Sequence, residues 1–208
     1  MSEPQQLTPI EARVLAVLVE KQATVPDTYP LSLNALVTGC NQKTAREPVM
    51  ELSESAVLEA IDTLRGYSLI IESSGGRVTK YAHNLPKVFG LPTPSVAILV
   101  TLILRGPQTV AELRANCERL YRFVDASSLE AFLEELSTRA ANPLTVLLPR
   151  APGARESRWA HLLSGTPELP ASTLSRPAEN GLAAEVASLR EEVMQLRAEV
   201  AELKALLA

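Results

Sequence analysis

Residues 53–83, SESAVLEAIDTLRGYSLIIESSGGRVTKYAH, begin with a helix signal and end with a hairpin signal. Ser53 is a typical N-cap residue, and Gly66 is typical of a helix end. The apolar residues between them recur at helical spacing: Val57, Ile61 and Leu64. The segments 69–71 and 77–81 are strand-like, and the glycines of residues 73–76 suit a tight turn between them. The stretch therefore predicts a helix followed by an antiparallel hairpin.

Two further helices are predicted upstream of this stretch. Thr8 is a candidate cap, Pro9 suits the first turn, and Glu11 completes a capping box. The apolar residues of this first helix share one face: Ile10, Val14, Val17 and Leu18. Ser32 caps a shorter segment, residues 33–37, which Gly39 ends. Three helices and a hairpin predict a winged-helix unit over residues 1–88.

The same order of signals recurs in residues 89–163. Thr93 and Pro94 start an apolar helix that ends before Gly106, and Thr109 opens a helix over residues 110–120. Ser127 and Glu130 form a capping box for a third helix. Strand-like residues 145–148 and 158–163 then flank a turn. The repeat predicts a second winged-helix unit, and the chain length allows each unit a small core of its own.

The end of the chain reads as a linker and a coiled coil. Residues 164–180 contain three prolines and few large apolar groups, which is typical of a linker. Residues 181–208 carry a heptad repeat with Val at a and Leu at d: Leu182, Val186, Leu189, Val193, Leu196, Val200, Leu203 and Leu207. This pattern favours two parallel strands. The fold class expected is mainly α with small antiparallel β hairpins, two tandem winged-helix units and a C-terminal parallel coiled coil.

Charges beside the heptad stripe support a parallel homodimer. Glutamates occupy the g positions and basic residues occupy the e positions five residues later: Glu185, Glu192, Glu199, Arg190, Arg197 and Lys204. Only a parallel pair sets every g glutamate against a basic e residue of the partner chain. A single amphipathic helix folded onto the globular part is the alternative, but the narrow stripe suits a coiled-coil seam better.

Composition limits the other possible partners. The 208 residues carry a formal charge of −4, so the basic excess that is typical of nucleic-acid-binding proteins is missing. The two cysteines, Cys40 and Cys117, form no metal-binding motif. The sequence shows no secretion signal, and its longest apolar stretch, residues 96–104, is about half of a membrane span. We expect a cytoplasmic protein without a membrane partner.

Catalytic signals are weak in this sequence. The only histidines, His83 and His161, each lie on a predicted strand beside an aromatic residue, where a structural role is commoner. A glycine-rich phosphate loop, a metal-ligand cluster and a nucleophile with its base are all missing from the sequence. We therefore expect no enzymatic activity, no metal and no cofactor.

Two groups of polar residues are candidate contacts for DNA or a protein partner. The hairpins carry the basic residues Arg77, Lys80, Arg150, Arg155 and Arg158. The connection after Gly39, unusually long for a helix-turn-helix, carries Asn41, Gln42, Lys43 and Arg46. The alternatives are surface arginines paired with neighbours such as Glu156, and a structural loop whose polar groups bond to the local backbone.

Four segments resemble the YceH family of bacterial proteins over about residues 5–165. These segments are Leu7 to Lys21, Cys40 to Thr44 with Arg46 to Met50, Arg77 to Tyr81, and Arg155 to Arg158. The resemblance implies a tandem winged-helix fold and no assigned biochemical role. Asn116, Cys117 and Glu118 depart from the more basic stretch that the family leads us to expect.

Fold analogy, the predicted dimer and the basic hairpins favour a DNA-binding regulator. The exposed positions of the two predicted third helices are acidic, however, including Glu54, Glu59 and Asp62 in the first unit and Glu130 and Glu134 in the second. Carboxylates repel phosphates, so a protein-interaction module without nucleic-acid binding is the alternative.

Deletion of residues 181–208 should convert the homodimer to a monomer, because it removes the whole heptad stripe. Sedimentation equilibrium of the full and truncated chains at micromolar concentration measures this change directly. A truncated chain that remains dimeric would contradict the assignment of the seam to these residues.

Overall fold

The computed structural model describes residues 6–167 except 75, 77 and 141. Helix α1 (Pro9–Thr24) begins with the expected capping box. The Glu11 amide donates to the Thr8 hydroxyl over 3.2 Å, and the Thr8 amide donates to the Glu11 carboxylate over 2.8 Å. The burial of α1 extends beyond the predicted apolar face, because every residue from Glu11 to Val19 is buried, including Arg13. Helix α1 is therefore a central helix with neighbours on all sides.

The first half of the described chain combines helices with a small antiparallel sheet. A 3-10 turn, η1 (Pro26–Thr28), precedes β1 (Leu31–Ser32), α2 (Leu33–Cys40) and α3 (Glu54–Gly66). The hairpin strands follow as β2 (Ile70–Ser73) and β3 (Lys80–His83). Strand order is β1-β3-β2, with Leu31 opposite Tyr81. The predicted third helix and hairpin are confirmed, whereas β1 was not predicted because it is only two residues long.

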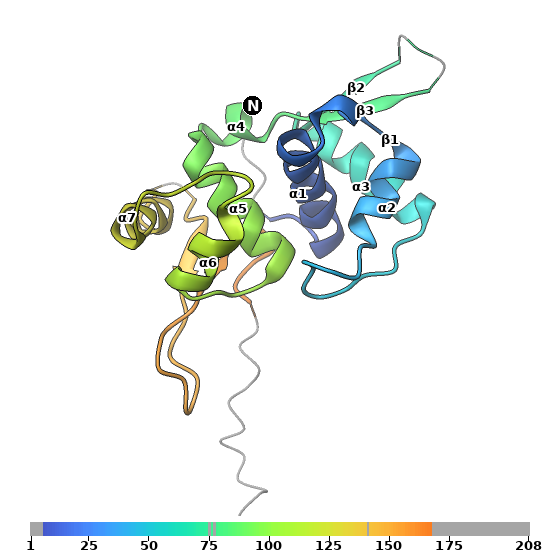
Figure 1. Cartoon of the computed structure of the whole chain (residues 1–208). Helices are drawn as coiled ribbons and strands as arrows, with labels where there is room; N and C mark the ends of the chain where they lie inside the picture. Colours follow the sequence, from blue (N-terminus) through green and yellow to red (C-terminus); the bar gives the residue numbers. More distant parts are fainter. Residues whose placement is uncertain (1–5, 75, 77, 141, 168–208) are drawn as a thin grey trace, which may run out of the picture. The chain divides into compact units, whose positions relative to one another are not determined.

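The second half repeats this order (Figure 1). A short helix, α4 (Leu85–Phe89), joins the halves and is followed by α5 (Thr93–Arg105), α6 (Val110–Cys117) and α7 (Ala126–Ser137). Strands β4 (Thr145–Leu147) and β5 (Trp159–His161) form an antiparallel pair. A bridge between Gln108 and Trp159 occupies the place that β1 has in the first half.

Several predicted boundaries differ from the structure, among them the end of the helix predicted over residues 110–120, which ends at Cys117. Three further differences have a visible physical reason. Helix α2 continues through Gly39 to Cys40, because Gly39 lies against α1 instead of ending the helix. Helix α7 begins after Asp125, whose carboxylate accepts the Ser128 amide over 2.7 Å, so Ser127 is not the cap. Strand β3 begins at Lys80, three residues later than predicted, where pairing with both β1 and β2 starts.

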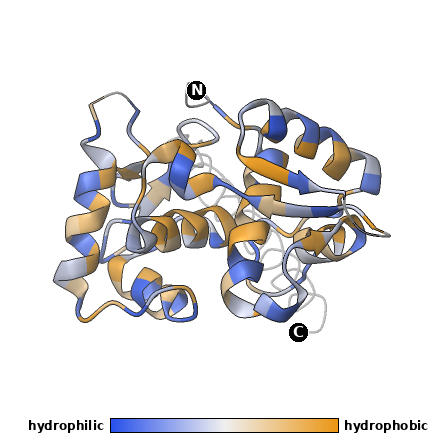
Figure 2. Ribbon diagram, turned by 90° about the horizontal axis from the view of Figure 1, so that it is seen from above, coloured by the Kyte–Doolittle hydropathy of each residue, from blue (hydrophilic) through white to orange (hydrophobic). Residues whose placement is uncertain are grey.

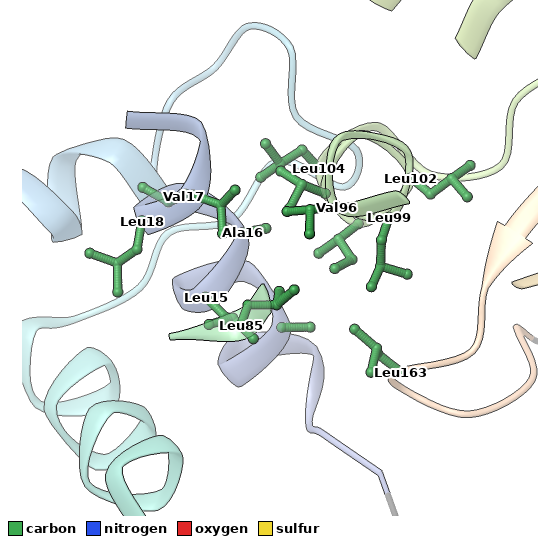
Figure 3. Packing of buried hydrophobic residues seen from close by; sticks show 14 of the residues in the cluster. Leu15, Ala16, Val17, Leu18, Leu85, Val96, Leu99, Leu102, Leu104 and Leu163 are labelled. Atoms are coloured by element: carbon green, nitrogen blue, oxygen red, sulfur yellow. The ribbon is translucent and has the colours of Figure 1, made fainter. Parts of the chain in front are cut away.

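One continuous apolar core contains residues of both halves, in place of the two small cores expected. Figure 3 shows buried side chains of α1, Leu15 and Ala16 among them, in the same cluster as Val96 and Leu99 of α5. The Leu7 amide also donates to the Leu163 carbonyl over 2.7 Å, which joins the beginning and end of the described chain. Figure 2 shows that the outer helices carry both hydrophobic and hydrophilic residues, as their one-sided burial requires.

Residues 6–167 belong to one compact unit. The predicted boundary between residues 88 and 89 falls inside α4 and stays a prediction. Residues 168–180 of the predicted linker and the whole predicted coiled coil, residues 181–208, lie outside the described residues, as does Gly75 of the first hairpin turn.

Gly39→Ala should lower the free energy of unfolding by about 1–3 kcal/mol, because overpacking forces the two helices apart. A Cβ atom at Gly39 would lie 2.6 Å from Cγ1 of Val17 on α1. Gly66→Ala is the matched control, since a Cβ there meets nothing within 4 Å. Urea unfolding should show the control within about 0.5 kcal/mol of the parent. Equal stabilities of the two variants would contradict the close α1–α2 approach.

Candidate functional site

The long connection between α2 and α3 is closed at its ends by Asn41. Its side-chain amide donates to the Leu52 carbonyl over 2.9 Å, and its carbonyl oxygen accepts the Leu52 amide over 2.7 Å. Asn41 is half-buried, and both hydrogen-bonding atoms of its side chain are used within the chain. Its role in this structure is to hold the loop together.

Arg46 is buried at the centre of the same loop, with only 5% of its surface exposed. Its guanidinium donates to the Gly39 carbonyl, the Gln42 side chain and the Glu20 carboxylate. Burial by itself would raise the pKa of Glu20, but the hydrogen bonds and charge of Arg46 outweigh it and leave that pKa lowered. Arg46 is thus bonded internally instead of facing a partner.

Arg13 of α1 holds the other side of the loop. It is 1% exposed and donates to the Pro48 carbonyl over 2.7 Å and to the Cys40 carbonyl over 3.4 Å. The amide of Glu47 donates to the Leu104 carbonyl over 2.7 Å, so the loop also contacts α5. Gln42 is half-buried and accepts a hydrogen bond from Lys21. Of the four loop residues predicted to contact a partner, only Lys43 is therefore exposed. These contacts fit the alternative of a structural loop better than they fit a loop that contacts a partner.

The first half presents an acidic face. Glu54, Glu59 and Asp62 are exposed on α3, and Arg65 pairs with Asp62 over 3.2 Å and with Glu72 over 3.0 Å. Lys80 is half-buried at the start of β3, and Arg77 lies outside the described residues. The described part of this hairpin therefore contributes little positive charge.

A groove of about 910 Å³ opens in the second half, between α6, α7 and the hairpin formed by β4 and β5. Its apolar floor comes from three separate parts of the chain, the loop after α6, β4 and β5: Phe123, Leu147 and Trp159. Its rim carries charges of both signs: Arg114, Arg122, Arg150, Arg155, Glu118, Glu130, Glu134 and Glu156. Two of the predicted contacts, Arg150 and Arg155, belong to this site, and both are exposed.

The eight rim charges form no ion pair with any residue that the structure describes. Arg114 alone among the rim arginines has a side-chain hydrogen bond within that part, to the Val124 carbonyl over 3.0 Å. Equal numbers of arginines and glutamates make the rim nearly neutral. The groove therefore offers charges of both signs to a ligand without a net attraction for either.

Arg158 differs from the rim arginines, because it forms an ion pair within the chain. Its guanidinium donates to both oxygens of Glu112 over 2.8 Å and to the Pro107 carbonyl over 2.9 Å. The pKa of Glu112 is lowered, first by the backbone amide of Thr109 and then by Arg158. The expected neighbour Glu156 is not the partner, so Arg158 fastens the hairpin to the start of α6.

An apolar tip stands beside the groove and was missed by the sequence analysis. Val124, between α6 and α7, is 87% exposed. Aromatic contacts support its loop, with ring centres 4.8 Å apart between Tyr121 and Phe123 and 6.1 Å apart between Phe123 and Phe132. Local sequence gives no sign of this exposure, because valine and two aromatic residues together are also typical of a core strand.

The two histidines are both half-buried. Burial lowers the pKa of His83 and of His161 to about 4, so both rings are neutral at pH 7. The Nε2 atom of His83 lies 2.6 Å from the side-chain oxygen of Gln22. Within residues 6–167, apart from the gaps, no three His, Cys, Asp or Glu residues are arranged to hold a metal ion. No described helix is long and apolar enough to cross a membrane.

A family model described as "Protein of unknown function, DUF480" matches residues 7–154. The chain belongs to this family, and the match includes both helices of the groove. A UPF0502 protein of Leptothrix cholodnii is 57% identical over 190 residues, which cover 89% of this chain and 85% of that relative. A UPF0502 protein of Methylibium petroleiphilum is 59% identical over 186 residues, with coverages of 88% and 79%. The expected membership of a bacterial family without an assigned role is confirmed.

A third relative, a UPF0502 protein of Cupriavidus necator, is 65% identical over 159 residues. These residues cover 76% of this chain and 65% of the relative. The three relatives thus match this chain over 159 to 190 residues, which is more than three quarters of its length.

Arg46→Met should lower the free energy of unfolding by about 2–3 kcal/mol, because it leaves the Glu20 carboxylate and the Gly39 carbonyl without their charged donor. Lys43→Met in the same loop is the control and should stay within about 0.5 kcal/mol of the parent, since Lys43 is exposed. Chemical unfolding of both variants measures the difference. A parent-like Arg46→Met protein would contradict the structural role of the loop.

Proposed function

We propose that this protein is a non-enzymatic interaction module made of two winged-helix units, in which the groove of the second unit binds a segment of another protein. The observation that carries the proposal is the combination of an apolar floor with eight rim charges of both signs, none of which forms an ion pair within the described part of the chain. An apolar centre surrounded by a polar rim is the usual anatomy of a protein interface.

Charge balance favours a protein over DNA as the ligand. Double-stranded DNA presents about one negative charge per 1.7 Å, so a DNA site gains affinity from an excess of cations. Four glutamates offset the four arginines of this rim. Glu130 and Glu134 lie on α7, the position of the helix that enters the major groove in DNA-binding winged-helix proteins, and they would repel the phosphates there.

The apolar tip supports the same proposal. Val124 is 87% exposed and Leu147 on the groove floor is 48% exposed, although both are large apolar side chains. Covering them removes apolar surface from water, which contributes about 25 cal/mol for each Å² buried. A protein segment provides the matching apolar side chains, whereas a phosphate backbone does not.

The predicted coiled-coil dimer would add a second copy of the groove. Two linked sites bind a partner that carries two matching segments far more tightly than one site does, without any new contact. The dimer extends this proposal, and its seam lies in residues outside the described part of the chain.

DNA binding by the second hairpin is the second candidate function. It is favoured by Arg150 and Arg155, which are exposed and form no side-chain hydrogen bond or ion pair within the residues described. These two arginines could contact a phosphate backbone, and such contacts make the affinity for DNA depend steeply on the salt concentration.

A photo-crosslinking amino acid at Leu147, inside the groove, should capture a discrete protein in cells of the source bacterium. The same probe at Val25, which is 41% exposed in the first half, is the matched control and should not capture that protein. The captured protein, once purified, should bind the parent chain and bind the Arg150→Glu, Arg155→Glu variant at least about tenfold more weakly.

Labelled duplex DNA, titrated at salt concentrations from about 50 to 200 mM, tests the second candidate in parallel. The proposal expects weak binding that the double variant leaves unchanged. Tight, salt-dependent DNA binding that is lost in the double variant, together with no capture from Leu147, would overturn the proposal in favour of DNA.

A further inference from the structure

We infer that the segment bound in the groove is an amphipathic helix with acidic side chains along one flank and basic side chains along the other. This inference rests on the proposed function and names the chemistry of its partner. It is carried by the distribution of charge around the groove, the size of the groove and the shortness of its sheet edge.

The rim charges are divided between the walls. The α7 wall contributes Glu130 and Glu134, which are four residues apart and therefore on one face of the helix. The hairpin wall contributes Arg150 and Arg155, and Glu156 leaves that wall with a positive excess. The charges of α6 and of the loop after it alternate in sign: Arg114, Glu118 and Arg122. A ligand complementary to both walls needs a basic side toward α7 and an acidic side toward the hairpin.

The groove is large enough to receive about two turns of a helix. Two turns of α-helix are about 11 Å long and about 10 Å across with side chains, which corresponds to roughly 860 Å³. The groove measures about 910 Å³. Residues at four-residue spacing on α6 and α7 also form the ridges against which a third helix packs. The apolar stripe of such a helix would cover Leu147, because Phe123 and Trp159 are already buried in the chain itself.

An extended segment fits the groove less well. It must pair its backbone amides and carbonyls with a sheet edge, and β4 offers only three residues, Thr145–Leu147. A helix satisfies its own backbone hydrogen bonds and needs only side-chain contacts from the groove. The groove provides such contacts from three sides.

Three synthetic peptides of about 18 residues, or five helical turns, test the inference against the full chain by fluorescence anisotropy at low salt. All share a leucine stripe at helical spacing. The mixed peptide has glutamates on one flank and lysines on the other, whereas the two controls have glutamates or lysines on both flanks. Exchanging the flanks of the mixed peptide is no control, because a helix bound in the reverse direction restores the match.

The mixed peptide should bind the parent chain about tenfold more tightly than either control, as expected for several exposed ion pairs together. The Arg150→Glu, Arg155→Glu variant should instead prefer the all-lysine peptide. The Glu130→Lys, Glu134→Lys variant should prefer the all-glutamate peptide. Such an exchange of preference is expected only if the substituted side chains face the charged side chains of the bound peptide. A change in folding does not produce it.

Variants with the same change in net charge elsewhere control for long-range effects. Lys43→Glu with Lys87→Glu matches the arginine reversal, and Glu54→Lys with Glu59→Lys matches the glutamate reversal. All four residues are exposed and lie outside the groove lining. These variants should keep the preference of the parent. Equal affinity for all three peptides, or binding of none of them, overturns the inference. If a protein is still captured from Leu147, the proposed function stands without it.

Discussion

The burial of α1 on all sides is the constraint on which the rest of the described structure depends. Residues Glu11 to Val19 are covered by the first half and by α5, so a charged side chain among them must find its partner inside the protein. Arg13 finds it in the carbonyls of Pro48 and Cys40. The loop after α2 is therefore held against α1, and the amide of Glu47 in that loop is bonded to Leu104 of α5. A single helix thus positions both the loop and the first helix of the second half.

Local signals predicted local structure well. The caps at Thr8, Ser32, Ser53 and Thr109 depend only on residues within one turn, and the structure has all four. The burial of α1 was not predictable in this way, because its polar residues Glu11, Arg13 and Glu20 suggest a solvent-facing side. Their partners lie far along the chain: Arg46 is 26 residues from Glu20, and Pro48 is 35 residues from Arg13. The periodicity of apolar residues along a helix does not indicate which distant residues pair with it.

The candidate site was predictable only in part, for the same reason. Sequence analysis identified the hairpin arginines but not which of them are free. Arg158 is paired with Glu112, 46 residues earlier, whereas Arg150 and Arg155 remain on the rim. The floor was not predicted at all, since Phe123 lies in the loop after α6, Leu147 on β4 and Trp159 on β5, and the three meet only in the folded chain. Exposed charge can be read from a sequence, but convergence of distant elements cannot.

The unpaired rim charges are better suited to selecting a partner than to holding it. An exposed ion pair contributes only about 0.2–1 kcal/mol, so even several of them give a modest affinity. Like charges brought together cost more, which excludes a ligand of uniform charge from a rim that carries both signs. Affinity must then come from apolar contact, and the exposed side chains available for it are Leu147 on the floor and Val124 beside it. A groove that binds a segment as proposed would therefore separate the two tasks. Its floor would provide a site of modest strength, and its rim would decide which segment occupies it and in which direction.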